Sequence, residues 1–225
     1  MKPPTVSHLL FDLDGTLIDS VGLILDSYSH VHQEHLQRVS VSSDHYRNRL
    51  GTPLLQVYQE LVEEHHQATE LVTAYKKHNR KLHDSKVTLY RGIRPMLEQA
   101  VEVGIKLALV TSKGRDVARR GLHVCGIEGF FSTIVALEDV RCHKPDPEPV
   151  QLALELLGAR VEGSLMIGDA PSDIRAGKAA GVLTGAALWG PFVREAFSEC
   201  PPDLWLKSPQ EITMIFGERS RETTG

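Results

Sequence analysis

The feature that most constrains the fold of this chain is a strand that has no partner close to it in the sequence. The apolar run at residues 6–11 ends abruptly in Asp12-Leu13-Asp14-Gly15, which is typical of a buried strand whose carboxyl end opens into a loop. No further strand pattern occurs before residue 105. Because the backbone groups of a buried strand must be paired, this strand has to lie in a sheet with strands that come only after residue 105.

A block of helical patterns separates the first strand from its expected partners. Asp19-Ser20 are residues typical of a helix N-cap, and apolar residues follow them at helical spacing. Two more amphipathic segments lie at 54–62 and 71–82, and only Gly51-Thr52-Pro53 interrupts the helical pattern firmly. We therefore predict that residues 20–88 are helical throughout and form an all-helical cap domain inserted into the sheet domain.

After about residue 90 strands and helices alternate, which is the signature of a parallel sheet with crossover helices. The predicted fold class is α/β, with a Rossmann-like, doubly wound parallel sheet formed by residues 1–19 and 89–219 and a polar tail at 220–225. The patterns predict strands at 106–110, 134–137, 165–167, 185–188 and, at one edge, 203–206, and helices at 95–103, 115–124, 147–157 and 172–180.

Composition and charge exclude several classes of protein. Hydrophobic residues make up 41% and charged residues 24%, so we expect neither a disordered chain nor a disulfide scaffold. A formal net charge of -4 argues against a nucleic-acid binder, which needs positive charge to neutralise phosphates. No apolar stretch reaches the ~18 residues of a membrane span, and the N-terminus lacks a secretory pattern. The three cysteines form no Cys-x-x-Cys pair, so we expect a cytoplasmic protein with reduced thiols and no membrane partner.

Polar residues follow the apolar segments at four places in the sheet domain. In open parallel sheets, ligands bind in the crevice outside the carboxyl ends of the strands. Any one of the four could be a turn followed by a helix cap, but four of them in this order predict a single site. They are Asp12-Leu13-Asp14-Gly15-Thr16, Thr111-Ser112-Lys113, His143-Lys144-Pro145 and Gly168-Asp169 with Asp173.

The charges at these places indicate the chemistry. Four carboxylates, those of Asp12, Asp14, Asp169 and Asp173, would converge at one sheet edge. Two carboxylates about 4 Å apart repel by about 4 kcal/mol at an effective dielectric constant near 20, so the cluster favours a divalent cation such as Mg²⁺. Lys144 would add a fixed positive charge, and hydroxyl and backbone N–H groups could donate to phosphate oxygens. These parts suit phosphoryl transfer, in which positioning and charge neutralisation supply most of the catalysis.

The same residues resemble the four motifs of the haloacid dehalogenase superfamily of hydrolases. The resemblance covers nearly the whole chain, including a helical cap inserted just after the first motif. It is closest to the branch of phosphoglycolate phosphatases and cytosolic pyrophosphatases, which Tyr90-Arg91-Gly92-Ile93 and the segment from His143 to Pro149 also resemble more loosely. The motif residues are Asp12-Leu13-Asp14-Gly15-Thr16, Thr111, Lys144 and Gly168-Asp169-Ala170-Pro171-Ser172-Asp173.

The resemblance implies a role for each motif residue. Asp12 would attack phosphorus and form an aspartyl-phosphate, and Asp14 would protonate the leaving oxygen and later help to activate water. Mg²⁺ would be held by Asp12, the backbone carbonyl of Asp14, and Asp169, with Asp173 as an additional acidic group at the metal or behind its ligands. The transferring phosphoryl group would be bound by Thr111, Ser112 and Lys144.

The cap offers weaker candidates. Relatives have a loop here that reaches over the active site, so Arg47, Arg49 and Gly51 could contact a second anionic group of the substrate, although a surface salt bridge is an equal reading for an arginine. Lys113 could bind a dianion or be a solvated residue at a helix entry. At helical spacing most of the cap histidines are predicted to lie on solvated faces; the eight are His30, His32, His35, His45, His65, His66, His78 and His83.

Several functions share these motifs. The leading expectation is a Mg²⁺-dependent hydrolase of a small phosphorylated metabolite or pyrophosphate. A sugar-phosphate mutase on the same scaffold is an alternative, as is a binding protein without catalysis. A dehalogenase is disfavoured because Asp14 is present, and an imine-forming phosphonatase is disfavoured because residues 21–36 contain no lysine. The oligomeric state and the natural substrate are not predicted.

Overall fold

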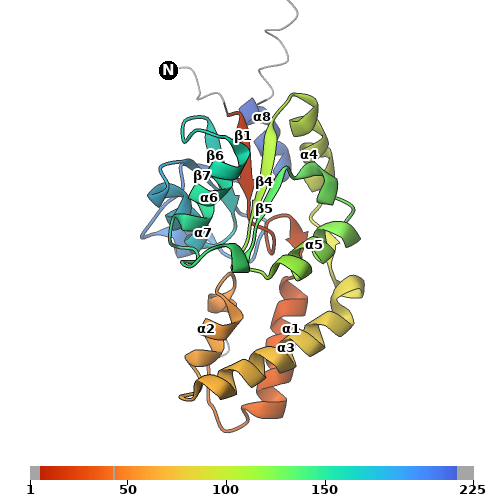
Figure 1. The fold of residues 1–225 in the computed structure, drawn as a ribbon, viewed down its shortest axis with the longest axis vertical. Coiled ribbons are helices and arrows are strands. Elements are labelled where there is room, and N and C mark those ends of the chain that lie inside the picture. The colour runs from red at the N-terminus through yellow and green to blue at the C-terminus, as the bar shows by residue number, and fades with distance from the viewer. Residues whose placement is uncertain (1–5, 43, 217–225) are drawn as a thin grey trace, which may run out of the picture.

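The computed structural model describes residues 6–42 and 44–216 and contains a six-stranded parallel sheet (Figure 1). The order of the strands across the sheet is β5-β4-β1-β6-β7-β8, and every neighbouring pair is parallel. The first strand lies in the middle, between strands that follow the helical block, as the sequence predicts. The strands are β1 (His8–Phe11), β4 (Lys106–Val110), β5 (Thr133–Val135), β6 (Ser164–Gly168), β7 (Leu183–Ala187) and β8 (Leu204–Leu206).

Helices cover both faces of this sheet, and this explains why its strands are apolar throughout rather than alternating. Leu9 and Phe11 of β1 pack on one side, in the cluster that includes apolar residues of α4 (Ile93–Glu102), α5 (Arg115–Val124) and α8 (Pro209–Phe216). Leu10 packs on the other side with α6 (Glu148–Leu157) and α7 (Pro171–Ala179). The predicted α/β fold class with a doubly wound parallel sheet is confirmed.

Three helices form a separate part of the molecule, which lies below the sheet in Figure 1. They are α1 (Val21–His35), α2 (Leu54–Gln59) and α3 (His65–Lys86). The helices pack on one another around an apolar cluster of their own that includes four tyrosines. In this cluster Tyr28 stacks on Tyr46 with ring centroids 4.7 Å apart, and Tyr75 lies against Tyr28 at 4.9 Å.

The two connections between the sheet and the helical part run side by side. Strand β2 (Ile18–Asp19) pairs antiparallel with β3 (Thr88–Leu89), and Asp19 lies opposite Thr88. The expectation of no strand in the block is therefore wrong at its last residue, Thr88. We keep the division into a core of residues 1–19 and 89–219 and a cap of residues 20–88 as a proposal.

The structure differs from the predicted elements at two other places, one where a predicted helix is absent and one where an unpredicted helix occurs. Residues 36–53 contain no α-helix within the described chain, only a 3-10 turn at Arg47–Arg49. The serines and β-branched valines of the segment Val39-Ser40-Val41-Ser42 favour non-helical backbone, which explains the interruption. Helix α8 has no counterpart among the predicted elements, although Pro209 at its start and the bond from the Lys207 N–H to Glu211 Oε2 (3.0 Å) are helix-start features. The predicted tail at 220–225 lies outside the described residues.

Candidate active site

The carboxyl ends of three adjacent strands bring the predicted motifs together. Asp12 follows β1, Thr111 follows β4 and Asp169 follows β6, and all three residues are buried. Strands β4, β1 and β6 are neighbours in the sheet and are parallel, so their ends lie at one edge. Lys144, from the loop before α6, is buried against the same edge. The predicted convergence of the four motifs is therefore present in the structure.

Two glycines let the backbone close around Asp169. Gly15 has φ +89°, and a Cβ there would lie 2.5 Å from the Asp169 carboxylate. A Cβ on Gly190, in the loop after β7, would lie 2.4 Å from the Cβ of Asp169. Thr16 Oγ1 donates to Asp169 Oδ1 (2.8 Å), and Trp189 Nε1 donates to the carbonyl of Thr16 (2.8 Å). Sequence reasoning did not predict these two contacts, because they join segments more than 150 residues apart.

Three buried carboxylates lie close enough to share a cation. Ligand oxygens of Asp12, Asp169 and Asp173 lie within 4.8 Å of one another. Burial raises the pKa of Asp12 to about 7. The charge of Lys144 lowers this pKa, and the charge of Asp173 raises it further. Burial, followed by the charges of Asp12 and Asp173, raises the pKa of Asp169 well above its usual value. Hard oxygen ligands under this mutual repulsion fit a divalent metal ion. The side chain of Asp14 lies outside this group.

Lys144 is fixed in the middle of the site. Its ammonium donates to Asp12 Oδ1 (2.7 Å), Asp173 Oδ1 (2.6 Å) and the carbonyl of Val110 (3.0 Å). Burial alone would lower the pKa of Lys144, but the charges of Asp12 and Asp173 outweigh it and hold that pKa above its usual value. Asp173 Oδ2 also accepts the N–H of Ala170 (3.0 Å) at the start of α7. Both carboxylate oxygens of Asp173 therefore accept hydrogen bonds from the protein. This favours the alternative in which Asp173 lies behind the metal ligands and does not bind the metal itself.

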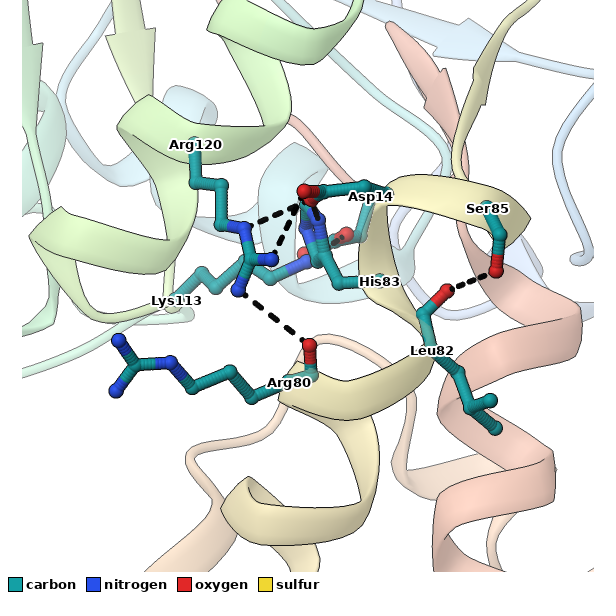
Figure 2. Close-up of polar contacts among 8 residues, drawn as sticks. Asp14, Arg80, Leu82, His83, Ser85, Lys113 and Arg120 are labelled. Carbon is teal, nitrogen blue, oxygen red and sulfur yellow. Dashed lines mark hydrogen bonds and ion pairs between the residues drawn. The ribbon is translucent and has the colours of Figure 1, made fainter.

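Asp14 is held by two donors on one oxygen. Ser20 Oγ donates to Asp14 Oδ1 at 2.5 Å, and Lys113 Nζ lies 2.5 Å from the same atom. Figure 2 shows Lys113 extending from the core to Asp14. Ser20 was expected to cap helix α1 with its side chain, but its hydroxyl binds Asp14 and makes no capping bond. Lys113 lies in the site and is not a solvated helix-entry residue.

The phosphate-binding candidates Thr111 and Ser112 present hydroxyl groups at the same edge. Thr111 Oγ1 accepts the backbone N–H of Lys113 (3.1 Å). The buried Oγ of Ser112 has no hydrogen-bond partner among the residues that the structure describes. Leaving a buried hydroxyl unpaired costs free energy that an incoming acceptor would recover. Ser112 therefore offers a donor that a phosphate oxygen can take.

The structure separates the three cap candidates. A Cβ on Gly51 would lie 3.6 Å from Ser172 Oγ and 3.7 Å from the Cβ of Ala170, so this loop reaches the start of α7 beside the site. Arg49 Nε is bound to Glu60 Oε2 (2.6 Å), as the salt-bridge alternative holds. The side chain of Arg47 is exposed and forms no hydrogen bond or ion pair with another described residue, while its backbone carbonyl accepts the N–H of Leu50 (3.2 Å). Only Gly51 is therefore seen against the core.

The expected solvated position holds for four of the eight cap histidines, His30, His35, His65 and His66, while His32, His45 and His78 are half-buried and His83 departs furthest. His83, in the last turns of α3, is fully buried, and burial lowers its pKa. Its Nδ1 lies 3.0 Å from Asp84 Oδ1, and Arg120 of α5 binds both oxygens of Asp84 at 2.7 and 2.9 Å. Arg120 also donates to the carbonyl of Arg80 (3.4 Å), as Figure 2 shows. Gly121 makes room for this contact, since a Cβ there would lie 3.1 Å from Ile18 Cδ1 and 3.8 Å from His83 Nε2.

Comparison with known proteins agrees with this geometry. The family model of the haloacid dehalogenase-like hydrolases matches residues 9–187, a range that includes every motif residue discussed above. The chain belongs to this family. The predicted family and the predicted class of enzyme, a hydrolase of the phosphatase type, are thereby confirmed.

Similar proteins come from several bacteria. The pyrophosphatase PpaX of Halalkalibacterium halodurans is 37% identical over 216 residues, which cover 96% of this chain and 99% of that protein. The pyrophosphatase PpaX of Bacillus velezensis is 36% identical over 217 residues, again 96% of this chain and 99% of that protein. Among solved structures, a putative phosphoglycolate phosphatase from Lactobacillus plantarum is 26% identical with a TM-score of 0.80 and covers 94% of this chain and 100% of its own. These haloacid dehalogenase-like relatives match the chain over almost its entire length.

Proposed function

We propose that this haloacid dehalogenase-like protein is a Mg²⁺-dependent phosphohydrolase of small phosphorylated compounds, with pyrophosphate as its preferred substrate. The observation that carries the proposal is the buried set of Asp12, Lys144, Asp169 and Asp173 at the carboxyl edge of the sheet, with Asp14 beside it. Two relatives that match over almost their whole length are named pyrophosphatases, and this supports pyrophosphate over a phosphate monoester such as phosphoglycolate.

The residues present fit a magnesium ion. Asp12 and Asp169, with the backbone carbonyl of Asp14, would hold it, and Asp173 would position Lys144. When bound, the ion would neutralise charge on the phosphoryl oxygens and on the crowded carboxylates. Thr16 keeps Asp169 oriented through its 2.8 Å hydrogen bond. Outer contacts of this kind fix the orientation of ligand carboxylates.

The proposed reaction has two displacement steps. In the first, an oxygen of the Asp12 carboxylate forms a bond to phosphorus, the bond from phosphorus to the leaving oxygen breaks, and that oxygen keeps the electron pair. Asp14 gives that oxygen a proton, which matters most where the leaving group is a strong base. In the second step water attacks the phosphorus of the aspartyl-phosphate, Asp14 takes the proton, and the Asp12 carboxylate is released with its electron pair. Thr111 and Ser112 hold the phosphoryl oxygens through both steps, and the ammonium of Lys144 beside Asp12 supplies positive charge to them.

The proposal places the enzyme in the cytoplasm. None of the described helices is long and apolar enough to cross a membrane. Cys125, Cys142 and Cys200 are free thiols, in keeping with a reducing compartment. The proposed partner is a small anionic substrate and not a nucleic acid, because the chain carries a net charge of -4.

A substrate panel tests this proposal. The purified protein is assayed with Mg²⁺ for phosphate release from pyrophosphate, phosphoglycolate and p-nitrophenyl phosphate, and each assay is repeated in excess chelator. We expect release from all three, fastest from pyrophosphate, and its loss in chelator. A hexose phosphate is included with product analysis, because isomerised sugar phosphate without free phosphate would indicate the mutase instead. Undiminished turnover in chelator, or no phosphate release from any compound, would refute the proposal.

A further inference from the structure

We propose that Lys113 recognises the charged leaving group of the substrate and so sets the preference for pyrophosphate over esters with an uncharged leaving group. This inference rests on the proposed function, because it names what one residue of that site contributes. In pyrophosphate the leaving group is itself a phosphate. A second cation is needed for it, in addition to Lys144, whose charge neutralises the transferring phosphoryl group.

Lys144 cannot be that second cation. An ammonium has three N–H donors, and Lys144 spends its three on Asp12, Asp173 and the carbonyl of Val110. Its side chain is only 2% exposed, so it is fixed behind the nucleophile. Lys144 can neutralise charge at the attacking side, but it has no donor left for a distal phosphate.

Lys113 has the donors and the position that Lys144 lacks. Among the described residues, Asp14 Oδ1 is the one acceptor of the Lys113 ammonium, at 2.5 Å, which leaves two N–H groups for a ligand. Its side chain is 14% exposed and that of Asp14 is 18% exposed, so neither is closed off in the core. The residue that protonates a leaving group must lie beside it, and Lys113 is bound to that residue.

The surroundings keep the charge of Lys113 available. The nearby His83 is buried and its pKa is lowered, so it adds no positive charge beside Lys113 at neutral pH. The carboxylate of Asp84, which contacts His83, is bound by Nε and Nη2 of Arg120. The backbone of Lys113 is fixed through its N–H bond to Thr111 Oγ1 (3.1 Å). One ammonium therefore faces the leaving-group side with Asp14 as its single described counter-charge.

The test separates substrates by the charge of the leaving group. Lys113→Met, Lys113→Gln and Lys113→Arg are compared with the unaltered protein on pyrophosphate and on p-nitrophenyl phosphate, whose aromatic ring carries no anionic group next to phosphorus. We expect kcat/KM for pyrophosphate to fall by about 10- to 100-fold in the Met and Gln variants, the scale of one charged hydrogen bond. For p-nitrophenyl phosphate we expect a distinctly smaller loss, because only the contact of Lys113 with Asp14 is removed. Lys113→Arg retains the charge and should recover most of the loss.

A binding readout and a control complete the design. Imidodiphosphate, which is not hydrolysed, is measured as a competitive inhibitor of p-nitrophenyl phosphate turnover, and its inhibition constant should rise by the same factor in Lys113→Met. Lys178→Met is the matched control, because Lys178 is a lysine of the same domain with a long 3.9 Å contact to Asp203. It should change neither value.

Three outcomes overturn the inference. An equal loss on both substrates would mean that Lys113 only maintains Asp14, and no loss on either would mean that it does not contact the leaving group. Unchanged inhibition by imidodiphosphate in Lys113→Met would exclude a binding role. Failure of the proposed function looks different, because then the unaltered protein would release no phosphate from either substrate.

Discussion

The negative charge of Asp12 is balanced by Lys144 through a 2.7 Å hydrogen bond, and this bond allows a clean test of the nucleophile. In Asp12→Asn the amide oxygen can still accept from Lys144, so the fold should be preserved while the attacking anionic oxygen is lost. We expect turnover to fall by about 10³-fold or more. Phosphate release and thermal unfolding, measured side by side, check this. A variant that keeps more than a tenth of the activity would contradict the assignment of Asp12.

Gly190 is a second residue at which one methyl group should matter. A Cβ there would lie 2.4 Å from the Cβ of Asp169 and 2.7 Å from the carbonyl oxygen of Gly15, and neither neighbour can give way easily. We expect Gly190→Ala to lower the free energy of unfolding by about 2–3 kcal/mol and to impair turnover, since Asp169 must shift.

Gly22 supplies the control for that substitution. A Cβ on this helical residue would have no atom within 4 Å. Gly22→Ala should therefore stabilise the protein, by up to about 1 kcal/mol, through the better helix propensity of alanine. Urea unfolding of both variants tests the pair, and similar losses of stability in the two would show that the packing around Gly190 is not what limits that position.

At the scale of elements, the contact between α3 and α5 is expected to respond to pH. Burial lowers the pKa of His83 in the folded protein, while in the unfolded chain the pKa is about 6.5. Below that pH the unfolded chain therefore binds more protons at His83 than the folded protein does. Stability from this contact is therefore complete above about pH 6.5 and is lost as the pH falls toward the folded pKa. We expect faster hydrogen exchange in the last turns of α3 at about pH 5.5 than at about pH 7.5.

Two histidine variants on the same helix check this interpretation. His83→Gln removes the titrating ring from the buried contact and should flatten the dependence of exchange on pH. His66→Gln changes an imidazole whose side chain is 70% exposed and should leave the dependence as it is. If His83→Gln retained the full pH dependence, another group of the junction would be responsible.

At the scale of the whole molecule, the crowded carboxylates tie stability to metal and to pH. Folding without metal raises the pKa of Asp12 to about 7 and also raises the pKa of Asp169. At a pH between the unfolded and the folded pKa of these carboxyl groups, the folded protein therefore binds more protons than the unfolded chain. Its stability should therefore fall as the pH rises from about 4 to about 7. Mg²⁺ at about 100 times its dissociation constant should add about 2.7 kcal/mol at neutral pH.

Asp169→Asn tests this coupling without chemistry. The amide oxygen can still accept from Thr16 Oγ1, which binds Asp169 at 2.8 Å, while one like charge is removed. We expect the metal-free variant to be more stable than the metal-free parent at pH 7.5, by about 1–2 kcal/mol, and to gain little from Mg²⁺. Thermal melts with and without Mg²⁺ measure both effects. A variant that is stabilised by Mg²⁺ as strongly as its parent would place the ion elsewhere.

The sequence predicts which strands carry the site better than it predicts the side-chain contacts that complete the site. Polar residues at the ends of apolar strands are a local pattern, so Asp12, Thr111 and Asp169 could be placed at one edge from spacing alone. The hydrogen bond of the Ser20 hydroxyl could not be predicted. The position of Ser20 before a helix suggests a bond to a backbone N–H of that helix, but in the structure the hydroxyl binds Asp14 instead.

Contacts between distant segments escaped prediction for a different reason. His83 has the same helical spacing as the exposed histidines of α3. It is buried because α5 packs against it, with Gly121 next to its ring. Trp189 likewise has no sequence signal that would connect it to Thr16. In both cases the deciding partner is set by the packing of elements, which a reading of neighbouring residues does not contain.

The short β2–β3 ribbon makes the helical part exchangeable. Since Asp19 and Thr88 are paired partners, residues 20–87 occupy the place of the turn in an ordinary β-hairpin. A two-residue turn would connect the same two ends, and the entropic cost of a longer insertion grows only slowly with its length. The helical part beyond Ser20, which binds Asp14, can therefore change in length and shape while the strands that carry the aspartates keep their register.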